Sequence, residues 1–208
     1  MKPLVCVTCG PAHEPLDEVR RLTNFSTGEI GTVIMAGLGG EKIESICFRG
    51  LGATSPVPSG DVRPFTTNAS LAASLQGLAR HPDVIFHAAA LSDFLIGDVS
   101  RSGAAKLDSR HGNIDVTLVP APKILPQLRR WFPKATIVGW KYELDGGRES
   151  AIQRACRQIN TAGSDACVVN GRAYGDGFGL LFPDGRLIAY PDKPSLAQAL
   201  LTTFVRSL

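Results

Sequence analysis

A loop of glycines and hydroxyl side chains near the N-terminus carries the first candidate chemistry. Residues 10–31, GPAHEPLDEVRRLTNFSTGEIG, follow a short apolar stretch at residues 4–9. Backbone N–H groups at a helix start are unpaired and lie at the positive end of the helix dipole, so a helix beginning near Thr27 could bind a phosphate. Gly28 would let an anion approach the backbone, and Ser26 adds a hydroxyl. A tight strand-to-helix turn with no ligand explains the same residues equally well.

The cysteines and histidines predict neither a disulfide framework nor a metal site. There are five cysteines, an odd number that does not suit complete pairing. Cys6 and Cys9 form a C-x-x-C pair, but residues three apart on a strand point to opposite faces, so we interpret both as structural. The four histidines lack the spacing of metal ligands.

Composition limits the class of protein. The chain has 208 residues, of which 44% are hydrophobic, and its net charge is +3. This suits one domain spanning residues 1–208 with a sizeable core, and the charge is too small to predict a nucleic-acid partner. We expect no membrane partner, because no apolar run approaches the length of a membrane span. The start, Met1-Lys2-Pro3, shows no signal peptide, so we expect a cytoplasmic protein.

The hydrophobic pattern predicts strands that alternate with helices. Apolar runs at residues 84–90 and 135–140 are typical of buried strands in a parallel sheet, and Pro183-Asp184-Gly185 predicts a hairpin turn. The expected fold class is α/β, an open, mostly parallel Rossmann-like sheet with helices on both faces and a small antiparallel hairpin or arm. We expect strands at residues 4–9, 42–48, 62–65, 84–90, 114–119, 135–140 and 165–170, and helices at residues 27–38, 68–80 (capped by Asn68), 122–131 and 148–162, with a final helix capped by Ser195.

Residues 91–113 interrupt the alternation of strands and helices. They combine Ser92-Asp93-Phe94 with a charged segment, rich in glycine and serine, that contains Lys106. Loops of this length inside compact domains are usually functional or disordered. We therefore expect this segment to contribute to function rather than to the core.

Five segments, in order, resemble the phosphopantothenoylcysteine synthetase family, also called phosphopantothenate–cysteine ligase. In many bacteria this enzyme is the C-terminal half of a bifunctional flavoprotein of coenzyme A synthesis. The segments that carry the resemblance are residues 10–31, HAAALSDF at 87–94, Lys106-Leu107, VGWKYEL at 138–144 and VVN at 168–170. The resemblance covers nearly the whole chain, and several separate segments in the right order make it far more specific than a glycine loop alone.

The resemblance implies a two-step ligation in coenzyme A biosynthesis. CTP or ATP, with Mg²⁺, would activate the carboxylate of 4′-phosphopantothenate as an acyl-nucleotide, and the amino group of cysteine would then form the amide. Such a reaction depends on positioning and on neutralising phosphate charge. No flavin is expected. The resemblance also implies a homodimer, to which residues 91–119 would contribute a lid and dimerisation segment.

The resemblance also assigns roles to individual residues. Asn24 would handle the acyl group, and Lys106 would close over the triphosphate. Asp93 would bond the ribose or a base edge, Trp140 would flank the base, and Arg154 would reach the phosphates. The implied nucleotide-binding residues are Gly10, Ser26, Thr27, Gly28, Ala88, Ala89, Asp93, Lys123, Ile124, Trp140 and Arg154.

Departures from the family pattern motivate a non-catalytic alternative and an expected nucleotide preference. Ala12 replaces a threonine, Asp108-Ser109 stand where many bacterial members carry lysines, and Ala121-Pro122 replace an asparagine-containing segment. The last change removes polar side chains near the base edge, so we expect ATP to be accepted at least as well as CTP. A non-catalytic nucleotide-binding relative is one alternative. The other, a short-chain NAD(P) oxidoreductase, would need a Tyr-x-x-x-Lys motif, which the chain lacks.

Overall fold

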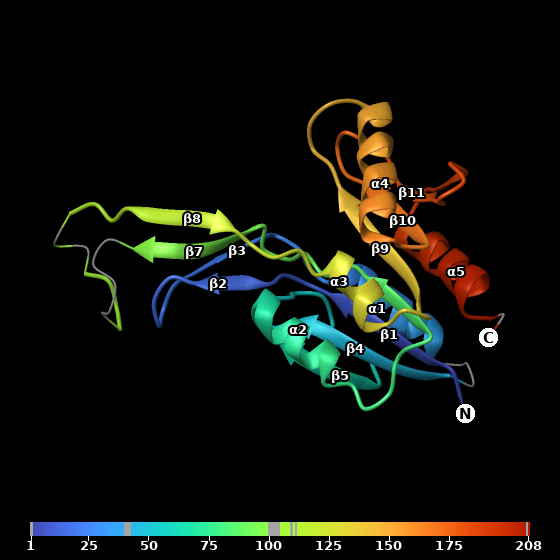
Figure 1. Cartoon of the computed structure of the whole chain (residues 1–208), viewed down its shortest axis with the longest axis horizontal. Helices are drawn as coiled ribbons and strands as arrows, with labels where there is room; N and C mark the ends of the chain where they lie inside the picture. Colours follow the sequence, from blue (N-terminus) through green and yellow to red (C-terminus); the bar gives the residue numbers. More distant parts are fainter. Residues whose placement is uncertain (1, 40–42, 100–104, 109, 111, 207) are drawn as a thin grey trace.

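The protein is built around one large, mostly parallel β-sheet (Figure 1). The computed structural model describes residues 2–39, 43–99, 105–108, 110, 112–206 and 208. The strands of the main sheet are β1 (Leu4–Cys9), β4 (Glu44–Gly50), β5 (Asp61–Phe65), β6 (Val84–His87), β9 (Thr136–Tyr142), β10 (Ala166–Asn170), β11 (Phe178–Leu181) and β12 (Leu187–Tyr190). Their order is β12-β11-β10-β9-β6-β1-β4-β5; β11 pairs in the antiparallel sense with both β10 and β12, and the other neighbours in this sheet pair in parallel. The expected fold class is therefore confirmed.

Helices cover both faces of this sheet. The helices are α1 (Glu29–Leu38), α2 (Asn68–Gln76), α3 (Leu125–Trp131), α4 (Arg148–Ala162) and α5 (Lys193–Phe204). On one face, Ile34 of α1 and Leu200 of α5 pack on Val7 and Phe86. On the other, α2 and α3 cover the half of the sheet near β1, and α4 covers β10. The core is thus two apolar layers separated by the sheet, and the ends of the strands stay free for a site.

Local chemistry explains where several helices begin. Thr67 caps α2 and forms a reciprocal capping box with Ser70, so the expected cap at Asn68 is one residue too late. The side chain of Asp192 accepts a hydrogen bond from the backbone of Ser195 and caps α5, which corrects the expected cap at Ser195. Gly31 lets α1 pack closely on β1, since a Cβ there would lie 2.3 Å from Cys9 Cβ.

An arm made of two small hairpins extends away from the main sheet (Figure 1). One hairpin pairs β2 (His13–Pro15) with β3 (Arg21–Thr23), and the other pairs β7 (Phe94–Val99) with β8 (Val116–Pro120). The interpretation of residues 91–113 as a long loop is corrected in part, because β7 lies within it. A register shift at Gly97 interrupts the alternation that would have marked this strand. Residues 100–104, 109 and 111 of the segment lie outside the described residues.

No helix in the part of the chain that the structure describes is long and apolar enough to cross a membrane.

Candidate active-site cleft

A cleft of about 1110 Å³ lies at the carboxyl ends of the central strands. Residues at or just beyond the ends of β6, β9 and β10 line it, together with the N-terminus of α1 and the facing sides of α3 and α4. The chain crosses from β4 and β5 on one side of β1 to β6 and β9 on the other, so the cleft lies at a switch point of the sheet. Ligands of open α/β sheets bind at such points.

The first loop of the cleft is held in place by Asn24. Its side-chain nitrogen donates to the Ala90 carbonyl (2.7 Å), and its oxygen accepts from the backbone N–H of Ser26 (3.1 Å). The carboxamide has two N–H groups, so one remains available to a ligand. Asn24 therefore ties the loop to the end of β6 and lines the cleft as well.

Glycine opens the N-terminus of α1 towards the cleft. Gly28 is the N-cap with φ 77°, a left-handed conformation that favours glycine, and no side chain caps the helix there. Ser26, Thr27, Gly28 and Glu29 line the cleft next to this helix start. The backbone can thus receive an anion at this point.

Cationic side chains dominate the charge of the cleft. Its charged lining comprises Lys123, Lys141, Arg154, Arg157 and Lys193 against the carboxylates Glu29 and Asp93. Two of these cations form ion pairs with lining carboxylates, Lys123 with Asp93 and Lys193 with Glu29. An excess of cations remains, and it suits a ligand that carries several negative charges.

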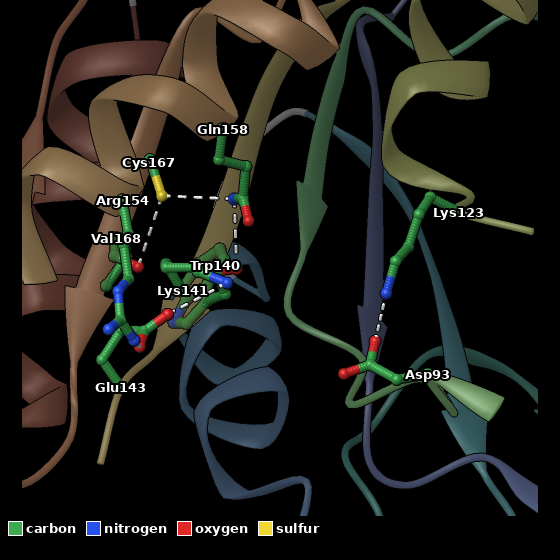
Figure 2. Close-up of polar contacts among 9 residues, drawn as sticks. All are labelled: Asp93, Lys123, Trp140, Lys141, Glu143, Arg154, Gln158, Cys167 and Val168. Carbon is green, nitrogen blue, oxygen red and sulfur yellow. Dashed lines mark hydrogen bonds and ion pairs between the residues drawn. The ribbon is translucent and has the colours of Figure 1, made fainter. Parts of the chain in front are cut away.

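A buried carboxylate orients two of the cations (Figure 2). Glu143 accepts from Lys141 at 3.0 Å and from Arg154, and its side chain is 8% exposed. Burial alone would raise the pKa of Glu143, but these two hydrogen-bonded cations lower it overall. Glu143 is therefore charged at neutral pH and holds Lys141 and Arg154 at the cleft.

The structure brings eleven of the thirteen predicted site residues to the cleft and leaves two outside. Those that line it are Asn24, Ser26, Thr27, Gly28, Ala88, Ala89, Asp93, Lys123, Ile124, Trp140 and Arg154. Gly10 is buried behind the first loop with φ 79°, where a Cβ would lie 2.8 Å from Ala53 Cβ. Its role is to let the loop pack, and it does not contribute to the lining.

Lys106 lies on the arm, away from the cleft of its own chain. The backbone on either side of it bonds to the turn between β2 and β3: Glu18 N–H donates to the Ala105 carbonyl (3.1 Å), and Arg20 donates to the Leu107 carbonyl (3.0 Å). The six residues of β7 separate this region from Asp93, a span of roughly 20 Å at about 3.3 Å per residue. Lys106 is exposed and does not line the cleft.

Several lining residues were missed by reasoning from the sequence. Lys141, Arg157, Lys193 and Asn170 line the cleft, as does the buried His87. Lys141 and Asn170 lie inside the segments VGWKYEL and VVN, so the match of these segments to the family could have identified them as site residues. Lys193 is far from any such segment and reaches the cleft only because α5 packs beside α1.

The described residues contain no cluster of three or more histidine, cysteine or acidic side chains that could hold a metal ion by themselves. Magnesium is usually held by one or two carboxylates together with substrate phosphates. Glu29 and Asp93 are the lining carboxylates that fit this pattern.

Comparisons with known sequences place this geometry in a family. A family model described as the DNA/pantothenate metabolism flavoprotein C-terminal domain matches residues 2–198. The coenzyme A biosynthesis bifunctional protein CoaBC of Thermococcus kodakarensis is 32% identical over 177 residues, which cover 80% of this chain and 40% of that protein. Human phosphopantothenate–cysteine ligase is 38% identical over 88 residues, 39% of this chain and 28% of that protein. The chain thus spans less than half the length of these relatives.

Solved structures have the same fold. The DNA/pantothenate metabolism flavoprotein from Streptococcus pneumoniae superposes with a TM-score of 0.83 at 23% identity and covers 97% of both chains. A Cab2 variant in complex with phosphopantothenate-cysteine has a TM-score of 0.77 at 18% identity, covering 99% of this chain and 86% of that one. With the match over residues 2–198, the chain belongs to the DNA/pantothenate metabolism flavoprotein C-terminal domain family.

Proposed function

We propose that this chain ligates 4′-phosphopantothenate to L-cysteine at the cost of a nucleoside triphosphate, forming 4′-phosphopantothenoylcysteine for coenzyme A biosynthesis. The observation that carries the proposal is the cleft, where an open helix N-terminus, Asn24 and a surplus of cations meet at the switch point of the sheet. Membership of the family, and relatives named as ligases of this kind, support it.

The nucleotide is bound by its phosphates and by its base at different parts of the cleft. Lys141, Arg154 and the N-terminus of α1 neutralise the phosphates. Ala88, Ala89 and Trp140 offer a flat apolar surface to the base or ribose, and Asp93 bonds the ribose or a base edge. Glu29 and Asp93 would provide protein oxygens for the Mg²⁺ that accompanies the nucleotide, and that ion would help to neutralise phosphate charge.

The reaction needs no covalent intermediate with the protein. An oxygen of the phosphopantothenate carboxylate attacks the α-phosphorus, and the bond to pyrophosphate breaks. The cysteine nitrogen then attacks the acyl carbon, the nucleoside monophosphate leaves, and the nitrogen loses a proton. The free N–H of Asn24 orients the acyl group, and the cations stabilise the charge that accumulates on phosphate oxygens.

The arm of a second copy supplies Lys106, so the active form is a homodimer. Two observations support this: Lys106 lies away from its own cleft, and the arm exposes apolar side chains that include Phe94, Val116, Leu118 and Val119. Several exposed apolar side chains on one small element suit an interface better than they suit contact with water. The lysine then acts as the expected lid, but on the neighbouring cleft.

A coupled pyrophosphate assay tests the proposal. Purified protein with Mg²⁺, phosphopantothenate and cysteine should release pyrophosphate with CTP or ATP, and release should stop when phosphopantothenate is left out. ATP should be accepted at least as well as CTP in competition. Nucleotide binding with no pyrophosphate release under any of these conditions would instead identify a non-catalytic relative.

A further inference from the structure

The imidazole of His87 has one nitrogen held by the protein and one open to the cleft. His87 ends β6, is 6% exposed and lines the cleft. Its Nδ1 lies 2.8 Å from Thr8 Oγ1. His87 Nε2 has no hydrogen-bond partner among the described residues. It is also not one of the fully enclosed atoms without a partner, which belong to Glu14, Arg49 and Ser164. Nε2 is therefore open to the cleft that His87 lines.

The hydroxyl of Thr8 decides which nitrogen of His87 carries the proton. Thr8 Oγ1 accepts the Ala89 N–H at 3.3 Å, and its own hydrogen can then donate to His87 Nδ1. Burial lowers the pKa of His87 to about 4, so the ring is neutral at pH 7 and has a single N–H. Thr8 is buried and its hydroxyl has no other acceptor among the described residues, so we assign its hydrogen to the bond with His87 Nδ1 and the ring proton to Nε2, which then presents a donor to the cleft.

Gln158 presents the complementary acceptor. Its side-chain nitrogen donates to the Trp140 carbonyl (3.2 Å) and to Cys167 Sγ (3.3 Å). A carbonyl can only accept, so these bonds fix which end of the carboxamide is nitrogen. The oxygen lies on the side away from Cys167 (Figure 2) and has no partner among the described residues, and the residue lines the cleft.

His87 and Gln158 are both adjacent to Gly139 at the end of the sheet. Gly139 of β9 is the cross-strand partner of His87, about 4.8 Å away as neighbouring strands are. The side chains of Gln158 and Leu125 pack directly over Gly139, since a Cβ there would lie 3.0 Å from each. Ala88 follows His87 and Leu125 packs beside Gln158, so both add apolar lining here, while Arg154 and Arg157 line the cleft from the same helix as Gln158. The pair suits the polar edge of a neutral ring.

We infer that His87 Nε2–H and Gln158 Oε1 select the nucleobase by its aminopyrimidine edge, the edge that cytosine and adenine share; the inference rests on the proposed nucleotide site. N3 of cytosine and N1 of adenine accept a hydrogen bond, and the exocyclic amine beside each donates one. Uracil and guanine present the reverse pattern, a ring N–H beside a carbonyl. They would set donor against donor and acceptor against acceptor, which leaves buried groups unpaired.

The test is a set of binding titrations by calorimetry with CTP, ATP, UTP and GTP. Phosphopantothenate and cysteine are left out, so the result does not depend on turnover. CTP and ATP should each bind at least about tenfold more tightly than UTP and GTP. 1-Deaza-ATP, in which the N1 acceptor is replaced by C–H, should lose about tenfold relative to ATP because it cannot accept from His87.

Variants assign the selectivity to the two residues. In His87→Leu, ATP and 1-deaza-ATP should bind equally, and Gln158→Leu should bring UTP and GTP to within about threefold of CTP and ATP. His81→Leu and Gln76→Leu, at exposed positions outside the cleft, are matched controls and should keep the wild-type selectivity.

The outcomes separate this inference from the proposed function. Selective nucleotide binding without ligation would support the inference and contradict the proposed ligase activity. Equal affinity for all four nucleotides, or an unchanged affinity for 1-deaza-ATP, would overturn the inference even if ligation occurs. The 1-deaza-ATP measurement uses the unaltered chain, so it decides the matter even if a variant fails to fold.

Discussion

The cleft and the arm differ in how far their residues are buried and bonded within the chain. At the cleft, β1 and β6 are buried along their whole length, and side chains such as Asn24 and Glu143 have their polar partners within the chain. On the arm, every residue of β3 and β8 is exposed. The cleft is thus held by contacts within the chain, whereas much of the arm is left exposed. In the proposed homodimer one active site is divided between them, with the binding surface on one copy and Lys106 on the other.

Disrupting the apolar surface of the arm should have the largest effect. Leu118 is 44% exposed on β8, and Leu118→Asp places a charge where a second copy would pack. We expect a monomer by light scattering and a loss of ligation of more than about a hundredfold, because each cleft loses the lysine from its neighbour.

A charge at another exposed apolar site provides the control for this change. Val57 is 68% exposed and lies outside both the arm and the cleft, so Val57→Asp should stay dimeric and active. A dimeric, fully active Leu118→Asp would show that the arm surface has no role.

Lys106→Ala should reduce acyl-nucleotide formation by about a hundredfold, as expected for one lost group that stabilises phosphate charge. Thermal unfolding should barely change, since Lys106 is exposed. Lys134→Ala, at an exposed position away from the cleft, is the matched control. Near-normal pyrophosphate release by Lys106→Ala would remove the arm from the mechanism.

Glu143→Gln tests the opposite region. The substitution removes the carboxylate that orients Lys141 and Arg154, so the KM for the nucleotide should rise about tenfold. The effect on kcat should be smaller, because both cations remain present. A changed kcat with an unchanged KM, measured in steady-state assays, would mean that Glu143 does not act through phosphate binding.

The smallest effect is a pH dependence of stability that comes from His87. Its pKa is about 4 in the folded chain, below the ordinary value of 6.5, so the unfolded chain binds the proton more readily between these values. Stability should therefore fall as pH drops from 6.5 towards 4, by about 2 kcal/mol at pH 5. Urea unfolding at pH 7.5 and pH 5 should show this loss in wild type and not in His87→Leu. An equal loss in both would assign it to other groups.

The sequence predicted the cleft better than it predicted the arm, and burial explains why. Strands β6 and β9 contain short unbroken apolar runs, so their pattern identifies them without tertiary contacts. On the arm, β2 and β3 are three residues each, and the bulge at Gly97 breaks the alternation of β7. Strands this short are specified by pairing rather than by their own pattern.

Motif matching likewise found only part of the site. Asn24 and Trp140 belong to continuous segments that are recognisable in the sequence and that lie at the ends of strands. Lys193 and the donor–acceptor pair of His87 and Gln158 depend on packing between elements far apart in the chain. Only the folded structure brings such residues together.

Mixing two inactive variants tests the divided site most directly. Asn24→Ala damages the cleft and Lys106→Ala damages the arm, so a mixed dimer contains one site with both wild-type groups. After the subunits of an equimolar mixture have exchanged, pyrophosphate release should recover to about a quarter of the wild-type rate, because half of the dimers are mixed and one of their two sites is intact. A rate no higher than the average of the two separate variants would contradict the account, because it would mean that Lys106 serves the cleft of its own chain.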